Sequence, residues 1–254
     1  MKRLLELEWL KVKSYRTFFV FSLSWLALIL LVYWGFDNLI KQSPINLSIV
    51  YRFPDVWYYS SYISSWLAPI PALLMINLVC NEITFRTMRQ QITDGLSRNE
   101  FLAGKLLFAI IISIICMLVV WLSGTLFGWI KGQNQNWSAY FSELSYILRA
   151  GWVTFGMMTA ALLIALLVKK SALSILVFLG IYWIIEPLAG NIWLKEIYPY
   201  FPLNSLDEFI SSPFQLQSIQ FGKNYTPVSI TIAGIIYPLL FIAGAWRLMK
   251  TRDL

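Results

Sequence analysis

Long apolar runs without a charged residue recur along the chain and are separated by shorter polar segments. Between Arg16 and Asp37 lie 20 uncharged residues, and between Asp55 and Glu82 there are 26. The later runs hold 25, 19, 15 and 23 residues. Because about 20 apolar residues in a helix cross the hydrocarbon core of a bilayer, the pattern predicts six spanning helices. We place them at about 17–36, 60–80, 101–130, 150–168, 171–188 and 227–247.

The predicted fold is an all-α integral membrane protein with one transmembrane domain over residues 1–254. The segment 1–16 mixes lysines with Leu and Trp, which is typical of an interfacial helix leading into the first span. The fifth run is short and ends at Glu186-Pro187, so two possibilities stay open. The helix extends past these residues, or it stops at the outer surface. A long external loop over 187–227 then precedes the last span.

Composition and charge agree with this reading. The chain is 58% hydrophobic and 13% charged, whereas soluble domains average roughly 25% charged residues. Of the 20 Lys and Arg, 14 fall on the side that holds both termini and the segments 81–105 and 169–170. Because basic residues are enriched in cytoplasmic loops, both termini are predicted to be cytoplasmic. This bias and anionic lipid explain the net charge of +7, so nucleic-acid binding is not expected.

Residues for catalysis or metal binding are scarce. The chain has no histidine, and Cys80 and Cys116 both fall inside predicted spans. We therefore predict no metal site, no disulfide framework and no His-dependent catalytic group.

The polar segment 81–105 is much longer than a turn requires. It predicts a short amphipathic helix with Phe85, Met88 and Ile92 on one face, and Asp94-Gly95 ends that helix because glycine tolerates the left-handed conformation. Ser97 and Glu100 have the spacing of a capping box, so the third span should begin in the cytosol at Arg98. Such a segment could pass force into the bundle or simply lie on the bilayer.

The second span has a polar outer half and two prolines, in the stretch "SSYISSWLAPIPALL". Pro69 and Pro71 predict a kink, because proline removes a helix hydrogen bond. The aromatic residues from Trp57 to Trp66 favour an interfacial belt over a binding cage. Glu186 ends the fifth span, and an acid at membrane depth is a candidate functional residue in its own right. The candidate translocation path is Ser64, Ser65, Trp66, Pro69 and Glu186.

The sequence "NEITFRTMRQQITDGLSRNEFLAGK" resembles the first cytoplasmic loop of permease subunits of ATP-binding-cassette (ABC) transporters, in the type 2 exporter class. The matching positions are Glu82, Thr87, Gly95, Ser97-Arg98, Glu100 and Gly104-Lys105. The family often has glycine just before the threonine, where this chain has Arg86. The order of a basic N-terminal segment, six spans and a long external loop before the last also fits the family.

The resemblance implies a bacterial inner-membrane permease that works as a homo- or heterodimer with a separate ABC ATPase subunit. The segment 82–95 would be the coupling helix, and its contacts with the ATPase would involve Glu82, Arg86, Thr87, Arg89, Asp94, Gly95 and Arg98. ATP and Mg²⁺ would be bound by the partner, because Gly104-Lys105 and Gly222-Lys223 both lack the remaining residues of a P-loop. The family's cavity lies between the second and fifth spans.

The substrate class rests on the uncharged spans and the aromatic outer half, which favour a hydrophobic or amphiphilic molecule such as a lipid, peptide or drug. Two other functions stay open. One is a carrier or scaffold that works without ATP, although carriers usually show paired broken helices with intramembrane charges. The other is a lipid-modifying enzyme, for which "DGLSR" is a faint hint, but Gln91 stands where that chemistry needs an aspartate.

Overall fold

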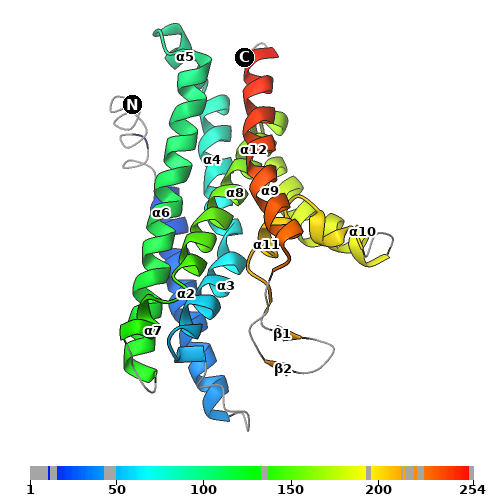
Figure 1. Cartoon of the computed structure of the whole chain (residues 1–254). Helices are drawn as coiled ribbons and strands as arrows, with labels where there is room; N and C mark the ends of the chain where they lie inside the picture. The colour runs from blue at the N-terminus through cyan, green and yellow to red at the C-terminus, as the bar shows by residue number, and fades with distance from the viewer. Residues whose placement is uncertain are drawn as a thin grey trace.

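The structure is a computed structural model, and it describes residues 11, 16–42, 50–132, 137–192, 196–212, 214–215, 220–221 and 226–251. The predicted interfacial helix 1–16 therefore lies outside the described residues, apart from Lys11 and Arg16. The described part is a helical bundle, and six of its segments are long and apolar enough to cross a membrane (Figure 1).

The first half of the chain supplies three spans and the connection between the second and the third. Its helices are α2 (Arg16–Gln42), α3 (Asp55–Leu67), α4 (Pro69–Thr84), α5 (Thr87–Thr93) and α6 (Arg98–Lys131). The second span consists of α3 and α4, which are separated at Ala68 immediately before Pro69. The predicted irregularity is therefore present, because Pro69 has no N–H to continue the ladder.

The second half supplies the remaining three spans and the loop 187–227, which is predicted to be external and which we call the external segment. Its elements are α7 (Trp137–Phe141), α8 (Ser145–Val168), α9 (Ser171–Gly180), the π-helix η2 (Ile181–Ile185), α10 (Glu186–Ile192), the 3-10 helix η3 (Tyr198–Tyr200), α11 (Asn204–Asp207), β1 (Phe214–Gln215), β2 (Gln220–Phe221) and α12 (Val228–Thr251). The strands β1 and β2 pair antiparallel, so the external segment contains a small ribbon as well as the short helices α10, η3 and α11.

The helix α8 is the centre of the bundle. It packs against α3, α4, α6 and α12, and its small residues let these neighbours approach closely. At Gly156, an added Cβ would come within 2.6 Å of the Leu206 side chain and 3.1 Å of Pro238. A glycine in α8 thus allows both the external segment and α12 to pack on it.

The fifth span leaves the bundle at an angle, with α10 projecting away from α8 and α12 (Figure 1). Its π-helical segment η2 directly precedes Glu186 and Pro187, and the Glu186 N–H bonds to the Ile181 carbonyl, five residues back. Proline clashes with the carbonyl four residues earlier and has no N–H for it, so a wider turn accommodates the ring. The helix therefore continues beyond the end of the apolar run, and the segment that is long and apolar enough to span a membrane is Ser171–Gly190.

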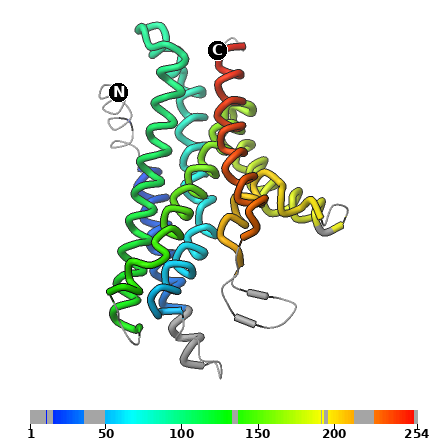
Figure 2. The backbone as a smooth tube through the Cα atoms, viewed as in Figure 1, coloured from blue at the N-terminus to red at the C-terminus, as the bar shows by residue number. Residues whose placement is uncertain are grey.

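The helix α5 and the C-terminal end of α12 lie at the same end of the bundle, whereas α7 lies toward the other (Figure 2). We call the first the α5 end. The helix α6 has 34 residues, which corresponds to a length of about 51 Å. A hydrocarbon core is about 30 Å thick, so α6 extends well beyond it.

Candidate functional site

The connection between the second and third spans is a rigid, capped structure. The helix α4 runs to Thr84, and α5 begins only at Thr87, so the helical part is shorter than the predicted 82–95. Phe85 and Arg86 form the break between them, and Phe85 is exposed instead of sharing a face with buried Met88.

Backbone conformation at Arg86 explains this break. Arg86 has φ 57° and ψ 14°, in the left-handed region. That region costs an L-residue roughly 1–2 kcal/mol and costs glycine almost nothing. Glycine, which the resembled family often has before the threonine, would adopt this conformation almost without cost. The Thr87 hydroxyl then bonds to the Glu82 carbonyl at 3.2 Å, which fixes the turn from the inside.

The C-terminal end of α5 is formed, as predicted, by Asp94 and Gly95. Gly95 has φ 98°, its N–H bonds to the Ile92 carbonyl, and the Leu96 N–H bonds to the Gln91 carbonyl. This pattern is a Schellman motif, in which a left-handed residue closes the last turn. Asp94, the residue before it, is exposed on the outside of this turn.

The capping box at the start of α6 is also confirmed. The Glu100 N–H donates to the Ser97 hydroxyl oxygen at 3.2 Å, and the Ser97 N–H donates to the Glu100 carboxylate at 2.8 Å. The next residue, Arg98, donates to the Met249 carbonyl at 2.9 Å at the end of α12. Free carbonyls and a negative partial charge mark a helix C-terminus, so this guanidinium ties the start of α6 to the end of α12.

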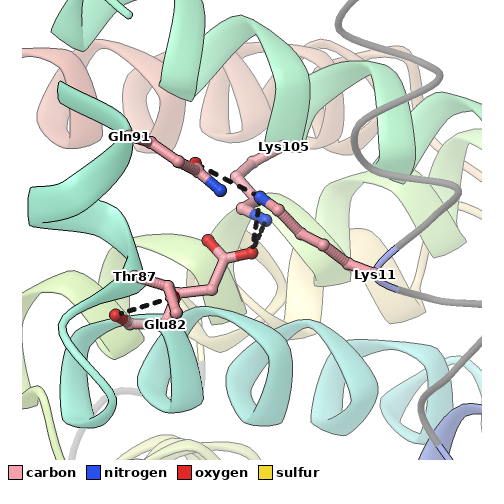
Figure 3. A network of polar contacts seen from close by, with 5 residues as sticks. All are labelled: Lys11, Glu82, Thr87, Gln91 and Lys105. Carbon is pink, nitrogen blue, oxygen red and sulfur yellow. Dashed lines mark hydrogen bonds and ion pairs between the residues drawn. The ribbon is translucent and has the colours of Figure 1, made fainter. Parts of the chain in front are cut away.

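Glu82 is the centre of a buried ionic cluster (Figure 3). Its carboxylate lies 2.7 Å from the Lys105 ammonium and 2.9 Å from that of Lys11. Lys105 is 0% exposed and its ammonium also lies over the Phe101 ring. Lys11 additionally donates to the Gln91 side chain at 3.3 Å. The cluster therefore joins the N-terminal segment, the end of α4, the helix α5 and the start of α6.

Sequence reasoning matched Glu82 and Lys105 to the loop pattern separately and did not pair them. It missed Lys11 and Gln91 altogether. A lysine one turn inside an apolar span, with an acid at the end of the preceding span, was the available signal. A buried charge needs a partner, and the two residues are only 23 apart in the chain.

In the outer half of the second span, two aromatic side chains face the interior of the bundle instead of forming the predicted interfacial belt. Trp57 and Tyr58 are fully buried: Trp57 donates to the Tyr140 carbonyl, and Tyr58 to the Ser211 carbonyl. The belt prediction is wrong at these two positions, because their polar atoms find partners in α7 and the external segment. Trp66, in contrast, is 65% exposed.

The proposed path residues therefore lie on two faces of the second span. Ser64, Ser65 and Pro69 are buried inside the bundle, and the Ser65 hydroxyl bonds to the Tyr62 carbonyl. Trp66 lies on the outer face, in line with partly exposed residues at helical spacing: Tyr62, Ile70, Leu73 and Asn77. Asn77 accepts a hydrogen bond from Ser171 at the start of the fifth span.

Glu186 is held by the external segment. Its two carboxylate oxygens accept the N–H groups of Leu203 and Asn204, at 3.0 Å and 2.7 Å. Nearby, Tyr182 donates to Asp207 at 3.0 Å, and burial raises the pKa of Asp207 to about 7, with a further rise from the charges of Glu208 and Glu186. This acid pair fastens the external segment to the fifth span.

Among the described residues no group of His, Cys, Asp and Glu is arranged to hold a metal ion. Cys80 and Cys116 are buried free thiols.

These features define a polytopic helical membrane protein with a capped, ionically anchored connection at one end of the bundle. The sequence pattern of the ABC-2 family transporter proteins matches residues 4–186, which is more than two thirds of the chain. The chain therefore belongs to the ABC-2 family of transporter membrane proteins, whose members are typically non-catalytic membrane subunits. The match includes the connection, four whole spans and the fifth span as far as Glu186. No curated protein matches the chain.

Proposed function

We propose that this chain is the membrane-spanning subunit of an ABC exporter, and that it drives transport with ATP hydrolysed by a separate ATPase subunit. The observation that carries the proposal is the rigid mounting of α5. One end of α5 follows directly from the second span, and the other leads through the capping box into the third. A force on α5 is thereby transmitted to two spans at once.

The buried ionic cluster strengthens this transmission. A loop that only lay on the bilayer would not need Glu82 and Lys105 to be locked together away from water. The pair makes the end of α4 and the start of α6 one body, with Lys11 adding the N-terminal segment. Arg98 extends the same body to α12. The connection is thus built to move several spans together.

The contact surface for the ATPase would be the exposed outer side of the connection, which includes Gln90, Thr93 and Asp94. Glu82, Thr87, Gly95 and Arg98 would act indirectly, since their contacts position α5 instead of facing outward. ATP and Mg²⁺ would be bound in the partner. The α5 end would face the cytoplasm of a bacterial inner membrane, as the distribution of Lys and Arg favours.

The transport path is proposed to lie at a dimer axis, between the outer face of the second span and the fifth span. Trp66 is exposed in the single chain and its neighbours on that face are partly exposed, and most residues of the fifth span are exposed or partly exposed. A second permease chain, identical or related, would cover both. The aromatic and uncharged lining favours a hydrophobic or amphiphilic substrate.

A carrier that works without ATP has one observation in its favour. The second span is interrupted at Ala68 and the fifth contains a π-helical segment, so two spans are irregular. Broken helices in carriers usually surround a charged ion site. Here Glu186, next to the π-helical segment, already accepts two backbone N–H groups, so we rank this function second.

Purification of the tagged chain from its native membrane in a mild detergent tests the proposal, with quantitative mass spectrometry of what co-elutes. We expect a P-loop ATPase at near one-to-one stoichiometry. A chain that elutes alone in every detergent would instead support the carrier or scaffold.

A further inference from the structure

A cavity of about 190 Å³ lies where α5 meets the ends of three spans. Its apolar wall includes Ile83 of α4, Leu166 of α8 and Leu248 of α12. Each of these residues lies in the last turns of its helix, so the cavity is at the depth where a spanning helix leaves the hydrocarbon core.

Three cationic side chains line the same cavity: Arg86 and Arg89 from the α5 connection, and Lys169 from the turn between α8 and α9. No acidic residue is among its lining residues. In the described part of the chain, none of these three side chains makes a hydrogen bond or an ion pair, whereas Lys11 and Lys105 nearby share Glu82. Three like charges around one hollow repel one another unless an anion neutralises them.

Arg86 and Arg89 are exposed and Lys169 is half-buried, so the cavity is open to its surroundings. An occupant that combines an anionic group with an apolar part would complement both the cations and the apolar wall. We propose that this cavity binds the headgroup of an anionic phospholipid from the leaflet at the α5 end, with Arg86, Arg89 and Lys169 around its phosphate. Basic pockets between spanning helices on the cytoplasmic side are a known form of lipid recognition. An acidic segment of the ATPase has the right charge, but the apolar wall at the ends of the spans favours a molecule that enters from the bilayer.

Binding there would connect the α5 connection to the turn that begins the fifth span. Arg86 and Arg89 belong to the first and Lys169 to the second, and one phosphate would bridge them. The lipid would then hold α5 against the bundle and make its mounting depend on membrane composition. This inference rests on the proposed orientation of the α5 end and on no property of the ATPase.

The test uses the full chain alone, reconstituted in nanodiscs of phosphatidylcholine with 20% fluorescent phosphatidylglycerol, and measures the labelled lipid retained after extraction into mild detergent. The pocket variant carries Arg86→Gln, Arg89→Gln and Lys169→Gln. The matched control carries Lys170→Gln, Arg247→Gln and Lys250→Gln, which remove the same charge from the same end but do not line the cavity. We expect binding to weaken about fivefold for each pocket cation removed, and the control to retain lipid like wild type.

The remaining outcomes each contradict the proposal. Equal losses in both variants would mean general surface attraction, and no loss in the pocket variant would mean that the cavity is not a lipid site. Displacement of the lipid by 50 mM inorganic phosphate in solution would identify a free anion site. A pocket variant that keeps its lipid but loses co-purification with the ATPase would assign the cavity to the partner protein. Lipid retention is measured without the ATPase. A result that contradicts the lipid site therefore does not bear on the proposed coupling of α5 to the ATPase.

Discussion

Replacing Lys105 by methionine removes half of a buried ion pair and leaves the Glu82 carboxylate out of contact with bulk water. Glu82 is 7% exposed, and Lys11, the cation that remains beside it among the described residues, has a side chain that is 24% exposed. Removing one partner of a buried pair costs roughly 3–5 kcal/mol. Since Lys11 still neutralises part of the charge, we expect a loss of about 3 kcal/mol. For a chain of this size that corresponds to a fall in Tm of about 6–12 °C.

The assay is thermal unfolding of the detergent-purified permease, followed by fluorescence-detected size exclusion. The matched control is Lys131→Met at the opposite end of α6, where the ammonium lies over the Tyr51 and Phe127 rings in a half-buried position. Such a contact is worth about 0.5–1 kcal/mol, so the control should lose about 4 °C or less.

A double-mutant cycle sharpens the result. Combining Glu82→Leu with Lys105→Met replaces the pair by apolar groups and frees Lys11 to reach water. It should recover more than half of the stability lost in Lys105→Met, because no carboxylate is then left buried. The reasoning is refuted if Lys105→Met melts with the control, or if the double variant loses the sum of the two single variants.

Three further predictions follow from the backbone, the cap and the external acid. Arg86→Gly should keep or raise Tm because glycine accepts φ 57°, whereas Arg86→Val should lower the unfolding free energy by about 1–2 kcal/mol; equal melting of both would contradict the strain. Ser97→Ala should cost about 1 kcal/mol through the lost cap of α6, measured as Tm against Ser142→Ala, and an unchanged Tm would count against the cap. The pKa of Asp207 is raised to about 7 from 3.8, so its contribution to stability is present at low pH and lost as pH rises through about 7. Hydrogen exchange of 196–212 should accordingly speed up between pH 5 and 8 beyond the intrinsic rate, and Asp207→Asn should remove that dependence; an identical profile in the variant would show that another group is responsible.

Much of the membrane fold is readable from charge spacing. Lipid excludes charge so strongly that an uncharged run of sufficient length has few alternatives to a spanning helix. The caps of the connection are readable for a similar reason: Gly95 and the Ser97–Glu100 pair act through bonds a few residues away. Interactions of this kind can be predicted from the sequence because both partners lie within a few residues of each other.

What could not be predicted depends on how the helices are turned about their axes. Ser64 and Trp66 are two residues apart, yet one is buried in the bundle and the other is exposed. Trp57 is amphipathic enough for a membrane interface, but its indole finds a carbonyl 83 residues away. The pairing of Glu82 with Lys105 likewise depends on the arrangement of α4 and α6 in space. The left-handed turn at Arg86 was hidden because arginine rarely adopts it.

The most direct measurement of the central claim is site-specific photo-crosslinking in native membranes. A photoreactive phenylalanine analogue is placed at Asp94, which is exposed at the end of α5, or, as the control, at Ser142. Ser142 directly follows α7, which lies at the opposite end of the bundle (Figure 1). The account predicts a crosslinked adduct with a P-loop ATPase from position 94 and none from position 142. An ATPase adduct from position 142 alone, or none from either position, would contradict it.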